Sequence, residues 1–177
     1  MDAREWSCTT RVNREVDRHL PGQTTLASSR DAIISVPLTT TIRVARATDV
    51  GAVLSLARPF ATSFVIDEHD FHQSYAALLT SPETRLLVAE SESGIVGYLL
   101  GVVHHTFFAN GRVASVEEIM VEESCRRQGV GETLMREFEA WARARECRLV
   151  SLATRRAAAF YAAIGYEESA VYFRKLL

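Results

Sequence analysis

Hydrophobic and polar positions change their period several times along the chain, which predicts alternating strands and helices from about residue 40 onwards. The stretch TTIRVARA (40–47) alternates as a strand does, and Asp49 then stands at a capping position ahead of residues with helical hydrophobic spacing. A second helix is expected over residues 70–79, because the helical pattern ends at Ser81-Pro82.

Three runs rich in β-forming residues follow, and we expect them to form consecutive hairpins. Glu92-Ser93-Gly94 is a tight-turn sequence between the first two runs, and Asn110-Gly111 favours a hairpin turn between the second and the third. Antiparallel pairing is therefore expected between the strands TRLLVAES (84–91), GIVGYLLGVVHHTFF (94–108) and RVASVEEIMV (112–121).

The remainder of the chain alternates helices and strands again. A long helix with Leu134, Phe138 and Trp141 on one face ends near Arg145, and a strand, a helix and a last strand are expected over 148–154, 156–165 and 168–177. The order β-α-α-β-β-β-α-β-α-β predicts a mixed α/β domain (α+β) over residues 40–177, with one central, partly antiparallel sheet.

Composition and charge exclude several classes of protein. Hydrophobic residues make up 47% of the chain and charged residues 24%, which is usual for a soluble globular domain. A formal net charge of -2 argues against nucleic acid as a partner, since such proteins normally carry a strongly basic surface. The longest apolar run (94–103) is too short to cross a membrane, and the N-terminus lacks a signal-type apolar core. We therefore expect a cytoplasmic protein in which residues 1–38 form a loosely ordered extension.

The three cysteines lie far apart in the sequence, and none belongs to a Cys-x-x-Cys pair or a Cys/His cluster. Neither a disulfide framework nor a metal site is expected from such spacing.

The stretch CRRQGVGETLM (125–135) places two arginines and a Gly-x-Gly where the long helix should begin. A P-loop would need Gly-Lys-Ser/Thr, and a dinucleotide fingerprint would need glycine in place of Leu134, so neither motif is present. Exposed N–H groups and the positive end of the helix dipole suit a pyrophosphate, and Arg126 and Arg127 add positive charge. The alternative is a plain strand-to-helix turn in which the glycines satisfy geometry and the arginines are solvated.

Two motifs together resemble the GNAT superfamily of acyl-CoA-dependent N-acetyltransferases. The first is R-x-x-G-x-G after a strand ending in Val121, and the second is F-Y-x-x-x-G-Y about thirty residues later. The resemblance covers about residues 40–177 in element order, and it implies a central, mostly antiparallel sheet that splays open to receive acetyl-CoA. In that family the pantetheine arm bonds the main chain of the splayed strand, and the loop wraps the pyrophosphate. Carried over to this chain, the implied cofactor-binding residues are Ile119, Met120, Val121, Arg126, Arg127, Gln128, Gly129, Val130, Gly131, Glu132, Thr133 and Thr154.

Acyl transfer to an amine requires a base, because an alkylamine has a pKa of about 10.4 and is protonated at neutral pH. Glu117 and Glu118 lie on the strand that should border the thioester, and either carboxylate could remove the proton through water. Strict alternation along the strand would let only one of them face the cleft. Glu117 would then share a face with Ile119 and Val121, and its position four residues before Val121 matches the base of polyamine-acetylating relatives, so it is the favoured candidate. The alternative is that both glutamates are solvated.

Tyr161 matches the tyrosine that many relatives direct at the thioester sulfur. A phenol with a pKa of about 10 can protonate a thiolate whose pKa is about 8.5. Adjacent residues of a helix point about 100° apart, so Phe160 is expected in the core and Tyr161 in the cleft. A Tyr161 that merely packs on the helix face is the alternative.

The resemblance implies an acetyl-CoA-dependent N-acetyltransferase that moves an acetyl group directly to a primary amine of a small molecule or peptide, without a metal. The N–H near Met120 would stabilise the oxyanion. A non-catalytic acyl-CoA-binding or regulatory module is the alternative, and the last strand, VYFRKLL, could pair across a homodimer.

Overall fold

The computed structural model describes residues 39–61 and 63–176, so the extension expected over residues 1–38 lies outside the described part of the chain. Five strands form one sheet in the order β1-β2-β3-β4-β5. Neighbours pair antiparallel except β4 and β5, which run parallel. The predicted mixed α+β fold with a mostly antiparallel sheet is confirmed, and its strands are β1 (Thr41–Val44), β2 (Thr84–Ser91), β3 (Gly94–Thr106), β4 (Gly111–Val121) and β5 (Val150–Leu152).

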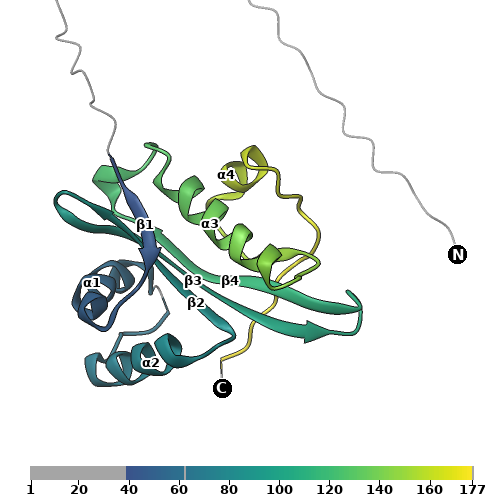
Figure 1. Cartoon of the computed structure of the whole chain (residues 1–177), viewed down its shortest axis with the longest axis horizontal. Coiled ribbons are helices and arrows are strands. Elements are labelled where there is room, and N and C mark those ends of the chain that lie inside the picture. The colour runs from purple at the N-terminus through teal and green to yellow at the C-terminus, as the bar shows by residue number, and fades with distance from the viewer. Residues whose placement is uncertain (1–38, 62, 177) are drawn as a thin grey trace, which may run out of the picture. The chain divides into compact units, whose positions relative to one another are not determined.

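Helices cover both faces of this sheet. Figure 1 shows α1 and α2 on one side of the strands and α3 and α4 on the other. Two buried hydrophobic clusters correspond to these layers, one between the sheet and α3 and α4, the other between the sheet and α1 and α2. The bounds are α1 (Val50–Phe60), α2 (Glu68–Thr80), α3 (Val130–Ala144) and α4 (Ala158–Ala163), with short 3-10 turns η1 (Ala47–Asp49) and η2 (Glu123–Cys125).

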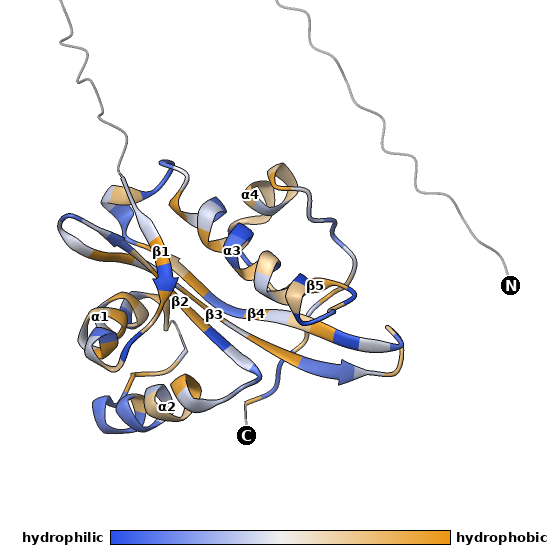
Figure 2. Ribbon diagram, viewed as in Figure 1, coloured by the Kyte–Doolittle hydropathy of each residue, from blue (hydrophilic) through white to orange (hydrophobic). Residues whose placement is uncertain are grey.

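Helix α3 is attached to the sheet by one apolar stripe. Leu134, Phe138 and Ala142 recur at intervals of four residues and are almost completely buried, as the predicted helical spacing requires. Along the ribbon of α3, hydrophobic and hydrophilic residues alternate (Figure 2). The helix therefore sits firmly on β2, β3 and β4, and its N-terminal end is fixed beside the end of β4.

Asp49 joins β1, β2 and the start of α1, although not as the helix cap expected from the sequence. Its carboxylate accepts bonds from Arg43 (2.7 and 3.0 Å) and from the N–H of Arg46 (2.7 Å), and Arg43 also bonds Glu90. The side chain makes no capping bond to α1. The Arg43 guanidinium is the main reason that the pKa of Asp49 lies below its ordinary value.

The last predicted strand is wrong for the described residues. Residues 168–176 form no strand, although the sequence there is rich in β-forming types. Val171, Tyr172 and Phe173 are 70–86% exposed, so the segment has the composition of a strand but no partner within the described part of this chain. Among the described residues, no helix is long and apolar enough to cross a membrane.

Candidate active site at the divergence of β4 and β5

The parallel pairing of β4 with β5 stops partway along β4. Three residue pairs join the strands, from Ala114 with Val150 to Val116 with Leu152, and β4 then continues alone to Val121. Beyond Val116, one edge of β4 therefore has no neighbouring strand within the described residues. This is the opening in the sheet that the sequence resemblance led us to expect.

A β-bulge lies at the point where the opening begins. Leu100 of β3 pairs with Glu118 and Gly101 pairs with Val116, so Glu117 is the extra, unpaired residue. Val116 and Ile119, three residues apart, both pack in the cluster beneath α3. Strict alternation therefore fails here, and it no longer decides whether Glu117 shares the face of Ile119 and Val121.

The register also decides which main-chain groups of β4 face the opening. The N–H of Glu122 donates to Val96 of β3 at 2.8 Å. Because every second residue of a strand directs its main-chain groups to the same neighbour, those of Met120 face β3. Those of Ile119 and Val121 face the opening. This register does not support a main-chain contact to a ligand, or an oxyanion bond, from Met120.

The loop between β4 and α3 presents a row of free donors. None of the N–H groups of residues 127–132 has an acceptor within the described part of the chain. Arg127 (φ 60°) and Gly129 (φ 82°) are both in the left-handed region, which is uncommon for a residue other than glycine. These donors stand at the N-terminus of a 15-residue helix, so the loop is suited to bind an anion.

The loop's side chains are held in several ways. Arg126 donates through Nε to the carbonyl of Val121 (3.0 Å), which ties the loop to the end of β4. Gln128 bonds the Ser124 carbonyl and Thr133 bonds that of Gly129. A Cβ at Gly131 would lie 3.4 Å from the ring of Phe160, so this glycine permits close packing of α3 against α4.

The other residues predicted to bind the cofactor differ in how freely they could reach a ligand. Val130 is buried and can offer only its main chain, while Glu132 is engaged in an ion pair with Arg136. Thr154, beyond β5, accepts a bond from the N–H of Ala157 (3.1 Å) and so supports the start of α4. Its hydroxyl hydrogen remains available to a ligand.

The burial of Tyr161 and Phe160 is the reverse of what we expected from the sequence. Tyr161 is only 8% exposed and belongs to the cluster beneath α3, whereas Phe160 is half-buried against the start of α3. The Tyr161 hydroxyl makes no hydrogen bond to the described residues. Burial raises the pKa of Tyr161 above its ordinary value, so the phenol keeps its proton at neutral pH.

The two glutamates differ in their surroundings. Glu117 is exposed and makes no hydrogen bond or ion pair with the described residues. Glu118 is half-buried and accepts a bond of 2.6 Å from the hydroxyl of Tyr98. Tyr98 was not among the residues singled out from the sequence. The register of the β3–β4 hairpin could have indicated it, because that register places Tyr98 diagonally opposite Glu118.

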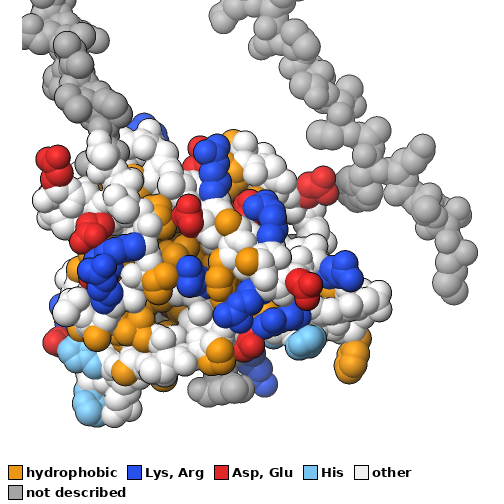
Figure 3. Space-filling model, viewed as in Figure 1, with side chains coloured by type: hydrophobic (Ala, Val, Ile, Leu, Met, Phe, Trp, Pro, Cys, Tyr) orange, Lys and Arg blue, Asp and Glu red, His pale blue; other side chains and the backbone are white. Residues whose placement is uncertain are grey.

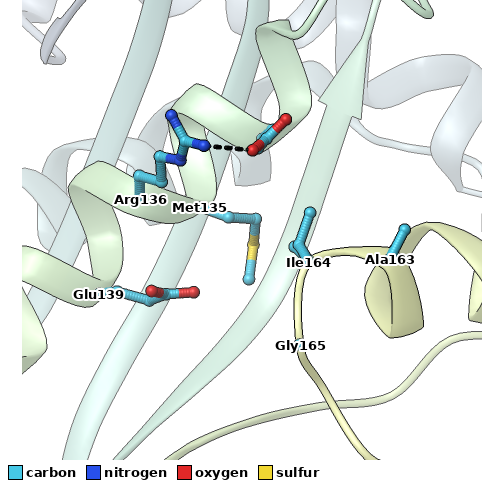
Figure 4. A pocket seen from close by; sticks show the side chains of 7 residues that line it. Met135, Arg136, Glu139, Ala163, Ile164 and Gly165 are labelled. Atoms are coloured by element: carbon cyan, nitrogen blue, oxygen red, sulfur yellow. Dashed lines mark hydrogen bonds and ion pairs between the residues drawn. The ribbon is translucent and has the colours of Figure 1, made fainter.

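Two hollows of the surface are lined by helix α3 and its neighbours. One of about 440 Å³ is formed where Met135 and Glu139 of α3 face Ala163 and Ile164 at the end of α4 (Figure 4). A second, of about 210 Å³, lies between α2, β2 and α3. Figure 3 shows hydrophobic side chains gathered in the middle of the visible face, with basic side chains among them. Within residues 39–61 and 63–176, no group of His, Cys, Asp or Glu side chains could hold a metal ion.

Comparison with known proteins identifies the class. A profile of the acetyltransferase (GNAT) family matches residues 52–166, more than half of the sequence, and the chain belongs to this family. It is an acetyltransferase by family and fold. No curated protein sequence matches it.

Solved structures share the fold at low identity. Glucosamine-6-phosphate N-acetyltransferase from Arabidopsis thaliana aligns with a TM-score of 0.70 at 17% identity, over 78% of this chain and 98% of that one. A transcriptional regulator from Bacillus halodurans gives 0.70 at 22% identity, over 78% and 100%. An aminoglycoside N-acetyltransferase in complex with CoA gives 0.69 at 18% identity, over 81% and 99%.

Proposed function

We propose that this acetyltransferase moves an acetyl group from acetyl-CoA directly to a primary amine of a small molecule or peptide. The observation that carries the proposal is the meeting of three features at one place. These are the unpaired edge of β4 beyond Val116, the free N–H groups of residues 127–132, and the adjacent carboxylates of Glu117 and Glu118 at the bulge. The names of two structural neighbours, which acetylate an amino sugar and aminoglycosides, support an amine acceptor.

The described residues fit acetyl-CoA as a co-substrate, which supplies an acetyl group activated as a thioester. The N–H groups of residues 127–132 would hold its pyrophosphate, together with Arg127 and the terminal nitrogens of Arg126. Main-chain groups of Ile119 and the N–H of Val121 would bond its pantetheine arm as a neighbouring strand does, since the Val121 carbonyl already accepts a bond from Arg126.

Two groups near the opening can move protons. Tyr161 carries a hydroxyl that stays protonated at neutral pH and can supply a proton to a departing sulfur. One of the carboxylates at the bulge, Glu117 or Glu118, can take a proton from the acceptor amine. At neutral pH, deprotonating an amine with a pKa of about 10.4 costs about 5 kcal/mol, and a base beside the bound amine helps to meet this cost.

The proposal is tested by measuring free thiol released from acetyl-CoA in the presence of a panel of amines. The panel holds a polyamine, an amino sugar, an aminoglycoside, a lysine peptide and a peptide with a free N-terminus. We expect release with one class of amine. Acetyl-CoA binding without release by any amine would instead favour a non-catalytic acyl-CoA-binding module.

We propose further that a second copy of the chain covers the exposed C-terminal segment. The outer edge of β5 has no partner strand within the described residues. Acidic Glu167 and Glu168 begin the segment, and basic Arg174 and Lys175 end it. Antiparallel pairing on β5 would set the acidic pair near Arg155 and Arg156, and the basic pair near Glu146 at the opposite end. In the single chain, Arg174 donates to Ser63 (2.9 Å). Pairing of each copy's segment with the β5 edge of the other copy would be a reciprocal contact of the kind that joins a two-fold dimer.

Light scattering after size exclusion tests this pairing. The full chain is expected to elute as a dimer, and Phe173→Asp as a monomer, because the change buries a charge in the paired segment. Phe107→Asp is the matched control, since Phe107 is also highly exposed, at the β3–β4 turn, and this variant should remain a dimer. A monomeric full chain would contradict the proposal.

A further inference from the structure

The hydrogen bond between Tyr98 and Glu118 distinguishes the two glutamates at the bulge. Tyr98 is 1% exposed, and its ring is packed in the cluster between the sheet and α1 and α2. Its hydroxyl therefore has a fixed position and donates to Oε2 of Glu118 at 2.6 Å. Glu117, the extra residue of the bulge, has no comparable restraint from the described residues.

Such a bond is directional, and it leaves one carboxylate oxygen free. Oε1 of Glu118 makes no hydrogen bond within the described part of the chain, and Oε2 is held by Tyr98. Burial, and then the negative charge of Glu118, raise the pKa of Tyr98, so the hydroxyl remains a donor at all ordinary pH values. A carboxylate fixed at one oxygen loses less freedom when its other oxygen engages a substrate.

We propose that Glu118 is the base and that Tyr98 is the residue that positions it. This inference rests on the proposed function. The acceptor ammonium first loses one proton to Oε1 of Glu118, directly or through one water, and Glu118 releases it to solvent. As the freed amine nitrogen then bonds the acetyl carbon and the carbon–sulfur bond breaks, the nitrogen loses its second proton to Oε1. Tyr161 gives its proton to the departing sulfur. Both residues then recover their starting states by proton exchange with water.

The location of Glu118 supports this role. It lies one residue before Ile119, whose main-chain groups face the opening, and β5 has left β4 just before it. Its side chain shares the face of Tyr98, Leu100 and Met120, against which α1 and α2 pack. An amine that enters between these helices and the opening would therefore meet Glu118 before it meets the cluster beneath α3.

The test compares single and double variants by steady-state kinetics with the amine that the panel identifies. Tyr98→Phe keeps the ring and removes only the hydroxyl, and we expect kcat to fall about tenfold, the effect of one hydrogen bond to a charged group. The KM for acetyl-CoA should be unchanged. Glu118→Gln should lower kcat by about 100-fold or more, and adding Tyr98→Phe to it should cause no further loss.

Tyr75→Phe is the matched control. Tyr75 is a buried tyrosine of the same cluster, and its hydroxyl donates to the Arg46 carbonyl at 2.8 Å. We expect this variant to unfold at a lower temperature but to keep the kcat of the unchanged protein. If Tyr98 had only a structural role, Tyr98→Phe would likewise unfold at a lower temperature and keep an unchanged kcat.

Three results would overturn the inference. The first is a kcat for Tyr98→Phe no lower than that of Tyr75→Phe. The second is that Tyr98→Phe lowers kcat by the same factor in the Glu118→Gln background as in the otherwise unchanged protein. The third is that Glu117→Gln, and not Glu118→Gln, abolishes transfer. If the unchanged protein transfers acetyl to no amine, the proposed function fails instead, and the variants are not needed to show it.

Discussion

Replacing Tyr161 with phenylalanine is expected to lower kcat for thiol release by about 100-fold, the lower range for loss of a general acid, with little change in KM. The hydroxyl is the one polar group of a ring that is 8% exposed, and no described residue accepts a bond from it. Phenylalanine preserves the packing with Phe160 and Tyr166 and removes only the proton donor. Steady-state rates with acetyl-CoA and the identified amine measure the effect.

Tyr166→Phe is the control for this experiment. Its ring lies 6.0 Å from that of Tyr161, and its hydroxyl donates to Glu139 of α3 at 3.0 Å. It should change stability without changing kcat. Equal activity of Tyr161→Phe and the unchanged protein would show that another group, or water, protonates the sulfur.

The second large effect is expected from Gly129→Val, which should raise the dissociation constant of acetyl-CoA more than tenfold. Gly129 has a φ of 82°, where a side chain costs about 1–2 kcal/mol, and a β-branched one is a clear outlier. A tenfold change in affinity corresponds to about 1.4 kcal/mol. Relief of this strain would turn the N–H groups of residues 127–132 away from a common point. Calorimetric titration with acetyl-CoA measures the loss.

Gly94→Val separates strain from binding. Gly94 also has a positive φ, 116°, with open space around its Cβ position, but it is the first residue of β3, next to the turn that follows β2. Both variants should unfold at lower temperature, and only Gly129→Val should bind acetyl-CoA weakly. Unchanged affinity in Gly129→Val would mean that the loop is not the pyrophosphate site.

Most of the fold could be predicted from the sequence, because its signals are local. Hydrophobic alternation and the turn at Asn110-Gly111 were enough to predict β3 and β4 as a hairpin, and β2 has the predicted bounds. The final strand was wrong because β-propensity indicates only that a segment can pair. It does not indicate with what, and residues 168–176 find no partner within the described part of this chain.

The site was predicted less completely, for a different physical reason. Loop glycines and arginines are visible in the sequence, whereas a β-bulge depends on the partner strand. The extra residue at Glu117 shifts the alternation, which undid the reasoning that favoured it over Glu118. The burial of Tyr161 and Phe160 was exchanged because α4 is only six residues long and its orientation is set by contact with α3.

The free donors of the loop also bear on how far the sequence can change. An N–H group is present in every residue except proline, so substitutions over residues 127–132 that keep the backbone course leave these donors in place. On the proposed function, binding of acetyl-CoA by this loop would then depend on the course of the backbone more than on residue identity. Structures only 17–22% identical to this chain nonetheless share its fold. On the proposed function, the sequence of this loop could therefore change widely, along with the side chains that meet the acceptor, while the chain retained its acetyl donor.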